Sequence, residues 1–126
     1  MNIETLRNYC LSKNRATECF PFDQSTLVFK VMNKMFALTD IDEVDLRIII
    51  KCDPEEAIAL REKYKFVEPG YHMNKKHWNL IKISHDVPDK LIEQWIDQSY
   101  NLVVKSLTKK QQAELNITKN NGKISV

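Results

Sequence analysis

One long amphipathic segment constrains the fold of this chain more than any other feature. Between Pro88 and Leu107, apolar residues recur every three or four positions, which is the spacing of one helix face. Charged and amide side chains occupy the opposite side. A helix with a single apolar face must pack that face against another apolar surface. We therefore expect this helix to lie on a sheet formed by the rest of the chain.

The strands of this sheet are predicted by runs of Val, Ile, Phe and Met. Leu46–Lys51 shows the clearest alternation, which places Ile48 and Ile50 on one face and the basic residues on the other. Two further runs flank Asn33 and predict a tight hairpin, because asparagine tolerates the positive φ that such turns require. Strands are expected at residues 17–20, 27–32, 34–38, 46–51, 66–68 and 78–83.

Three shorter helices complete the pattern. Asn2 can cap a helix over residues 2–13. An Asp-Pro-Glu-Glu sequence begins a second helix over residues 53–64, because proline and acids suit the first turn of a helix. A capping-box sequence from Thr108 predicts a last helix to about Leu115.

The order of these elements indicates an α+β fold. We expect a two-layer sandwich in which helices cover one face of an antiparallel sheet and leave the other face open. The chain has 126 residues and is expected to form one domain over residues 1–115, with a flexible tail over residues 116–126. Its 19 Lys and Arg residues against 17 Asp and Glu residues give a net charge of +2, which excludes a polybasic protein.

The residues that usually carry catalysis or bind metals are sparse. Cys10, Cys19 and Cys52 form no CxxC pair and are expected to stay reduced, which suits a cytoplasmic protein. The histidines have spacings that fit neither a helical metal pair nor a zinc finger, and no phosphate-binding loop or nucleophile–base pair is visible. We therefore expect no enzyme activity, cofactor or metal. The acids between Asp40 and Asp45 are interpreted as a solvated loop, with a cation or partner site as the alternative.

Basic and aromatic residues suggest a binding surface instead. Pro69–Trp78 combines lysines, histidines, a tyrosine and a tryptophan on one bend, and nucleic-acid contacts use such residues. Strand alternation adds cations on the open face, where they could bind phosphates. The plainer interpretation is a solvated face with Trp78 in the core and the histidines holding the bend. The candidate nucleic-acid-binding residues are Lys30, Lys34, Arg47, Lys51, His72, Lys75, Lys76, His77, Trp78 and Lys82.

Several short sequences of this chain follow the pattern of a known family. They are Glu18–Phe22, Val28–Val31, Lys34–Leu38, Pro69, His72–Trp78, Val87–Asp89 and Trp95–Tyr100. On these residues the chain resembles the MmcQ/YjbR family of small bacterial proteins, and the segment from Pro69 to Trp78 is the most specific match. The resemblance spans about residues 1–115 and implies a frataxin-like (CyaY-like) fold, in agreement with the pattern of helices and strands.

The resemblance also implies DNA binding by two hairpins that act as wings, at residues 30–34 and 72–77. Met32 and Asn33 stand where a glycine-rich turn is expected, which leaves the type of the first turn open. Because the net charge is only +2, we expect DNA binding to be weak and salt-dependent. We expect the protein to be monomeric.

Two other functions stay open at this point. Iron handling like that of the frataxins needs acids along the first helix, and residues 2–13 contain only Glu4, so the sequence counts against it. The main alternative is a protein- or small-anion-binding module with no nucleic-acid role. It is suggested by Ile49, Leu80 and Trp78, which would lie among the cations on the open face. Fold alone does not choose between these functions.

Overall fold

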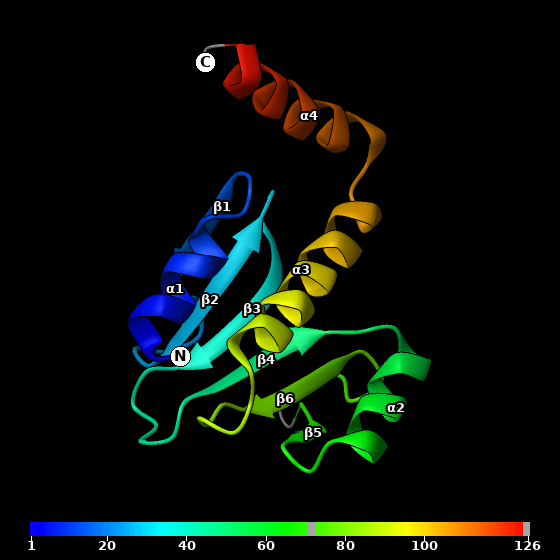
Figure 1. Ribbon diagram of the computed structural model, residues 1–126. Coiled ribbons are helices and arrows are strands. Elements are labelled where there is room, and N and C mark those ends of the chain that lie inside the picture. The colour runs from blue at the N-terminus through cyan, green and yellow to red at the C-terminus, as the bar shows by residue number, and fades with distance from the viewer. Residues whose placement is uncertain (71–72, 125–126) are drawn as a thin grey trace.

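The structure is a computed structural model that describes residues 1–70 and 73–124, with side chains as far as Asn116. Its sheet has six strands in the order β1-β2-β3-β4-β6-β5, and all neighbouring strands are antiparallel (Figure 1). The strands are β1 (Ala16–Cys19), β2 (Thr26–Val31), β3 (Lys34–Asp40), β4 (Arg47–Lys51), β5 (Val67–Pro69) and β6 (Trp78–Lys82). The helices are α1 (Ile3–Leu11), α2 (Pro54–Lys63), α3 (Asp89–Ser106) and α4 (Lys109–Ile124).

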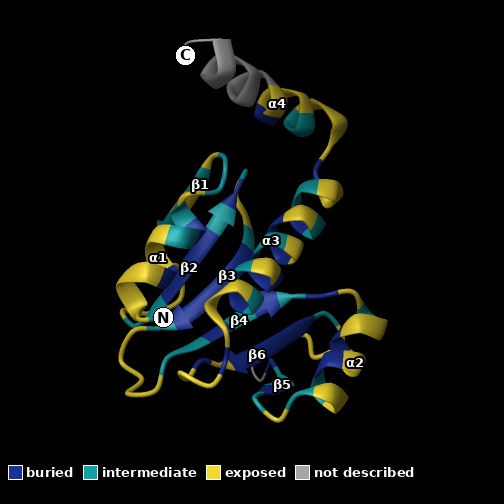
Figure 2. Cartoon of the chain, viewed as in Figure 1, coloured by how far each residue is buried: buried dark blue, intermediate teal, exposed yellow. Residues whose placement is uncertain are grey.

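Helices α1, α2 and α3 cover one face of the sheet. In Figure 1, α1 lies over β1 and β2, α3 crosses the central strands, and α2 lies beside β5 and β6. Figure 2 shows that the central strands and the inward sides of these helices are mostly buried, whereas the outward sides of the helices are exposed and the edge strand β1 is of intermediate burial. The predicted two-layer α+β sandwich is therefore confirmed. The opposite face of the sheet, called the open face below, carries none of these three helices.

Helix α3 buries the predicted apolar stripe against the sheet, through Ile92, Trp95, Ile96, Ser99, Tyr100 and Val103. The serine in this stripe connects two strands. Its Oγ accepts a hydrogen bond from the Lys51 amide at 2.8 Å and donates one to the Phe36 carbonyl at 2.6 Å. Both partners lie beyond the last β3–β4 residue pair, Ala37–Ile50. Ser99 therefore joins β3 to β4 where the strands no longer pair directly.

The β2–β3 hairpin is confirmed, and the structure identifies its turn type. Met32 and Asn33 have φ values of 50° and 68°, and two successive positive φ values are typical of a type I′ turn. The register then shifts between Phe29 and Lys30, which is the mark of a β-bulge. The bulge explains why the successive residues Phe36 and Ala37 both belong to the main core cluster, whereas Leu38 belongs to a separate one. The bounds of all six strands agree with the predicted bounds to within two residues.

Helix α4 is longer than the sequence pattern indicated. It begins as predicted, because Thr108 and Gln111 cap it with reciprocal amide-to-side-chain hydrogen bonds of 3.1 Å. It then continues to Ile124, past the expected end at Leu115, in a sequence that no proline interrupts. Leu115 is buried, and its carbonyl accepts a hydrogen bond from Asn14 Nδ2 at 3.1 Å. The flexibility expected for residues 116–126 stays a prediction.

Candidate functional site

The open face has an apolar middle. Strand register aligns Val28, Leu38, Ile49 and Leu80 across the four central strands. Val28 and Leu38 form a small buried cluster with Trp78, separate from the core beneath the helices. The aliphatic row is what strand alternation predicted for β4 and β6, where Ile49 and Leu80 were expected on this face. The middle of the face is therefore suited to apolar contact.

The loop between β5 and β6 folds over one end of this apolar row. The Gly70 amide donates to the Trp78 carbonyl at 2.8 Å, and the Met73 amide donates to the Gly70 carbonyl at 3.0 Å. Met73 packs against the small cluster together with Met35 and Ile49, and Trp78 in this cluster is only 8% exposed. Trp78 is thus a buried support for the loop, because its ring has no free face on which a nucleobase could stack.

Lys30 and Lys51 lie near the Trp78 end of the open face, and Lys75 and Lys76 lie in the loop that enters β6 at the same end. Lys51 is paired with Trp78, and Lys30 is paired with Met35, which packs against the cluster that contains Trp78. Lys75 and Lys76 belong to the loop that precedes β6 and are exposed. We call the group formed by Lys30, Lys51, Lys75 and Lys76 the basic end. Neighbouring strands are about 4.8 Å apart, so the backbones of β2 and β4 that carry Lys30 and Lys51 are about 10 Å apart across two strand spacings.

Hydrogen bonds hold the loop of the basic end in place. The Lys76 amide donates to Asn74 Oδ1 at 2.9 Å, and the His77 carbonyl accepts a hydrogen bond from the Cys52 amide at 2.7 Å. Arg61 reaches from α2 and donates through Nη1 to the Lys75 carbonyl at 3.4 Å. His77 is half-buried. Its backbone bonds contribute to fixing the bend.

The remaining predicted contacts lie elsewhere. Lys34 Nζ donates to the Ser106 carbonyl at 3.3 Å, which directs it to the C-terminal end of α3. Arg47 and Lys82 are paired with each other at the opposite end of β4 and β6, and Lys82 forms an ion pair of 3.0 Å with Glu68. His72 lies outside the described residues. The structure therefore brings together only part of the predicted set.

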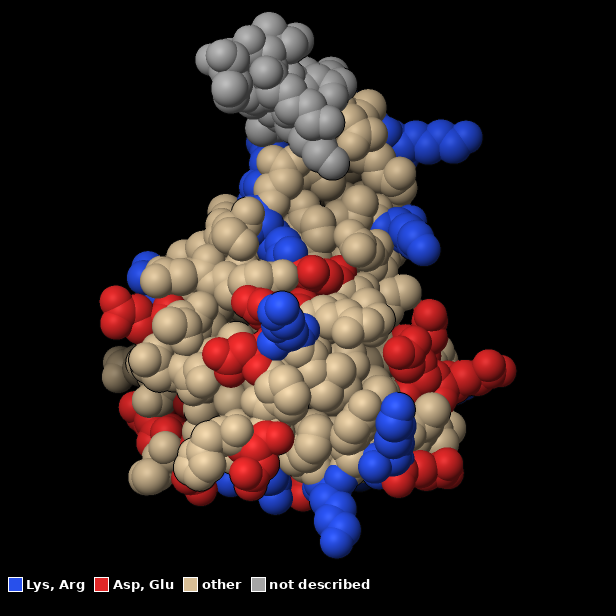
Figure 3. All heavy atoms as spheres, in the orientation of Figure 1, with Lys and Arg blue, Asp and Glu red and all other residues tan. Residues whose placement is uncertain are grey.

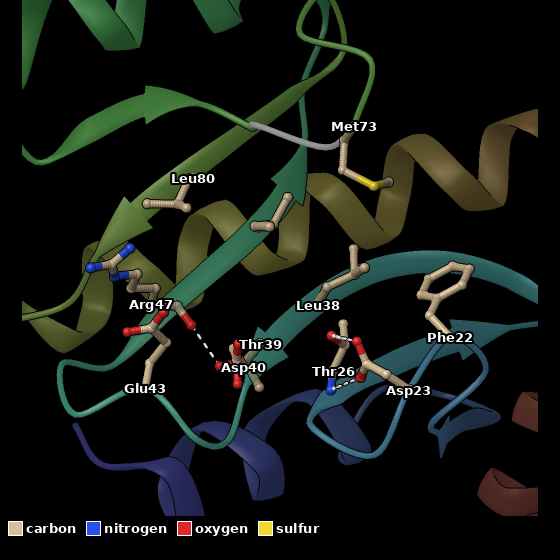
Figure 4. Close-up of a pocket in the computed structure, with 11 residues that line it drawn as sticks. Phe22, Asp23, Thr26, Leu38, Thr39, Asp40, Glu43, Arg47, Met73 and Leu80 are labelled. Carbon is tan, nitrogen blue, oxygen red and sulfur yellow. Dashed lines mark hydrogen bonds between the residues drawn. The ribbon is translucent and has the colours of Figure 1, made fainter.

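A groove lies on the open face and includes Ile49 and Leu80, two of the residues that suggested a protein- or small-anion-binding module. It has a volume of about 630 Å³, and Figure 4 shows Leu38, Leu80, Phe22 and Met73 around it. Three acids lie along one edge of the groove, and Arg47 lies at one end of that edge. The residues that line the groove are Phe22, Asp23, Thr26, Leu38, Thr39, Asp40, Glu43, Arg47, Ile49, Met73 and Leu80.

Two signals in the sequence pointed toward this groove. Alternation placed Ile49 and Leu80 on the open face, and the acids of residues 40–45 directly precede β4. Neither signal revealed that Phe22 and Met73, which come from segments far apart in the sequence, enclose the same space.

The helix-bearing side has a different character. Figure 3 shows acidic and basic side chains scattered over it among neutral surface. Asp97 of α3 accepts a hydrogen bond from Tyr9 at 2.7 Å and forms an ion pair with Lys13. These contacts tie α1 to α3 and give Asp97 and Lys13 a structural role. The open face is therefore the stronger candidate for function.

Two of the three cysteines, Cys10 and Cys52, are buried. Burial raises the pKa values of Cys10 and Cys52 to about 12, so both thiols stay protonated near neutral pH. Among the described residues, no group of three or more His, Cys, Asp or Glu side chains could hold a metal ion. No helix in the same residues is long and apolar enough to cross a membrane.

Comparison with known proteins places this geometry in a family. The sequence model of the YjbR family matches residues 11–102. The uncharacterized protein YbdF of Escherichia coli O157:H7 is 34% identical over 113 residues, which cover 86% of this chain and 89% of that protein. The uncharacterized protein YjbR of Escherichia coli K12 is 33% identical over 109 residues, which cover 85% and 91% of the two chains.

Solved structures agree with this assignment. A crystal structure of the Deinococcus radiodurans protein DR2400, with the family domain DUF419, superposes with a TM-score of 0.84 and 41% identity. That match covers 91% of this chain and 88% of the other. A Pseudomonas syringae crystal structure matches with a TM-score of 0.70 and 27% identity, over 81% and 98% of the two chains. In sequence and in fold, the chain belongs to the YjbR family.

Proposed function

We propose that this protein is a non-enzymatic DNA-binding protein that contacts phosphates through the basic end of its open face. The observation that carries the proposal is the gathering of Lys30, Lys51, Lys75 and Lys76 at one end of an otherwise mixed surface. Among the described residues, Lys30, Lys51 and Lys76 have no carboxylate within ion-pair distance, so they can offer charge to an external anion.

The geometry favours contact with the phosphate backbone over reading of bases. Lysine acts as a flexible point charge that suits phosphate, whereas the planar donor patterns of Arg, Asn and Gln are better matched to base edges. Stacking by Trp78 is prevented by its burial. Binding should therefore be independent of sequence. If all four lysines contact phosphates, the logarithm of the affinity should fall with the logarithm of salt concentration with a slope between about −3 and −4.

Charge reversal at two lysines tests the proposal. Fluorescence anisotropy would follow binding of a labelled duplex and a labelled single strand between about 50 and about 200 mM salt. The double variant Lys51→Glu/Lys76→Glu should bind at least about tenfold more weakly than the wild type. The slope of the logarithm of its affinity against the logarithm of salt concentration should be smaller in magnitude by about two.

The matched control is Lys65→Glu/Lys90→Glu. Both residues are exposed, and they lie in the α2–β5 connection and in the first turn of α3, away from the basic end. The control changes the net charge by the same amount and should bind nearly as well as the wild type. Equal losses in the two double variants would mean that only net charge matters, and an absence of binding at low salt would refute DNA binding itself.

A further inference from the structure

The groove on the open face is bordered by two loops that expose large apolar side chains. The first loop precedes β2 and contains Phe22, which is 62% exposed and lines the groove. The second loop joins β3 to β4 and contains Val44, which is 99% exposed. The Ile41 amide donates to the Ser25 carbonyl at 2.9 Å, so the two loops lie side by side. Exposed apolar residues that gather around a groove mark an interaction site.

The same two loops, together with the last residue of β3, carry a concentration of negative charge. Five carboxylates, from Asp23, Asp40, Asp42, Glu43 and Asp45, lie in residues 23–45, and we call them the acidic edge. Asp23, Asp40 and Glu43 line the groove directly, and Figure 4 shows them along one side of it. Arg47 is the one cation among the described residues that line the groove. A ligand that suits this edge should be positively charged.

Hydrogen bonds within the two loops order the acidic edge. Asp23 Oδ1 accepts hydrogen bonds from the Ser25 amide at 2.9 Å and the Thr26 amide at 2.6 Å. These bonds lower the pKa of Asp23, so its carboxylate stays charged at neutral pH. Asp40 Oδ1 accepts a hydrogen bond from the Asp42 amide at 2.9 Å, which orders the start of the second loop. The negative charges are therefore held next to the apolar floor of the groove.

The extent of the surface favours a macromolecular ligand over a small one. A small molecule could fill the groove between Leu38, Ile49 and Leu80, but it would leave the exposed side chains of Ile41 and Val44 uncovered, because they do not line the groove. A segment of a partner protein could cover both. The charge of the edge also argues against docking on an anionic membrane surface or on nucleic acid.

We propose that this groove binds a cationic amphipathic segment of a partner protein. Apolar side chains of that segment would occupy the floor formed by Leu38, Ile49 and Leu80, and its Lys or Arg residues would face the acidic edge. This mode corresponds to the docking of an amphipathic helix in a groove. It goes beyond DNA binding. The acidic edge lies at the other end of β3 and β4 from Lys30 and Lys51, so the protein would carry two sites of opposite charge on one face.

The test uses synthetic peptides and two surface variants. A labelled peptide of about 18 residues, with leucines on one helical face and lysines elsewhere, is long enough to form a helix. Its binding is measured by fluorescence anisotropy. Phe22→Ser and Glu43→Lys should each weaken binding about tenfold. The matched controls on α2, Ile58→Ser and Glu62→Lys, replace exposed residues of the same types and should change affinity by less than about twofold.

Several outcomes would overturn the proposal. They are equal binding of a peptide with Glu in place of every Lys, equal effects of the test and control variants, or no binding at about 100 µM peptide. A dimer in sedimentation that Phe22→Ser abolishes would assign the groove to a second copy of the chain instead. Lys51→Glu/Lys76→Glu should leave peptide binding unchanged within about twofold, which separates this site from the proposed DNA contact.

Discussion

Removal of the Ser99 hydroxyl should destabilise the protein far more than the loss of one oxygen atom suggests. The hydroxyl is fully buried and satisfies both the Lys51 amide and the Phe36 carbonyl, at 2.8 and 2.6 Å. In Ser99→Ala both backbone groups lose this partner. Each lost bond is worth about 1 kcal/mol net, and a buried group left unpaired costs about 1–3 kcal/mol.

Water can reduce part of this cost, because Lys51 is only half-buried. We therefore expect a total loss of about 2–4 kcal/mol in the free energy of unfolding. Urea denaturation followed by circular dichroism measures this loss. Hydrogen exchange gives a second readout, because the Lys51 amide should exchange faster in Ser99→Ala while amides in α1 follow only the global change in stability.

Ser106→Ala is the matched control on the same helix. Its Oγ donates only to the Val103 carbonyl within α3, at 2.6 Å, and the residue is exposed. Alanine also has a higher helix propensity than serine, so this variant should stay within about 0.5 kcal/mol of the wild type. A loss of less than about 0.5 kcal/mol in Ser99→Ala, or equal losses in the two variants, would refute the view that Ser99 joins β3 to β4.

Three further predictions concern stability, pH and thiol reactivity. Gly70→Ala should cost about 1–3 kcal/mol in thermal or chemical denaturation, because a Cβ there would lie 3.0 Å from backbone and side-chain atoms of β6; an unchanged midpoint would count against this contact. Asp23 has a lowered pKa in the folded state, so it contributes stability above its unfolded pKa and loses that contribution as the pH falls through its folded pKa. Asp23→Asn should therefore flatten the acid limb of a stability–pH curve, and an unchanged limb would contradict the assignment. Cys10 and Cys52 are buried with pKa values near 12, so mass spectrometry after alkylation at mildly alkaline pH should find Cys19 labelled first, whereas early labelling of either buried thiol would be inconsistent with their burial.

Sequence patterns predicted the elements that depend on local chemistry. Apolar residues at every second position of Leu46–Lys51 predicted correctly which residues of β4 are buried. Apolar residues at every third or fourth position after Pro88 predicted the buried side of α3. Asn33 marked the hairpin, because its backbone conformation is a local property. These features need no knowledge of distant neighbours, which is why sequence alone was sufficient for the fold class.

The candidate site was less predictable, because it depends on contacts between distant segments. Alternation placed Trp78 on the open face, but it is buried there in a cluster with Val28 and Leu38, against which Met73 packs. Lys34 was placed on a hairpin with Lys30, but its Nζ reaches the end of α3 instead. The groove likewise combines Phe22 with β3, β4 and β6. The sequence predicts on which face of a strand a side chain lies, but the contacts that this side chain makes depend on the tertiary structure.

The division of the open face into a basic end and an acidic edge is the central claim, and one NMR titration tests it most directly. The ¹⁵N-labelled protein is titrated with a short DNA duplex of arbitrary sequence at low salt, and amide shifts are mapped onto the structure. The amides of Lys30, Lys51 and residues 75–76 should shift together, while those of Phe22 and Glu43 should not. Shifts centred on the acidic edge or on the helix-bearing side, or no shifts at all, would contradict the claim.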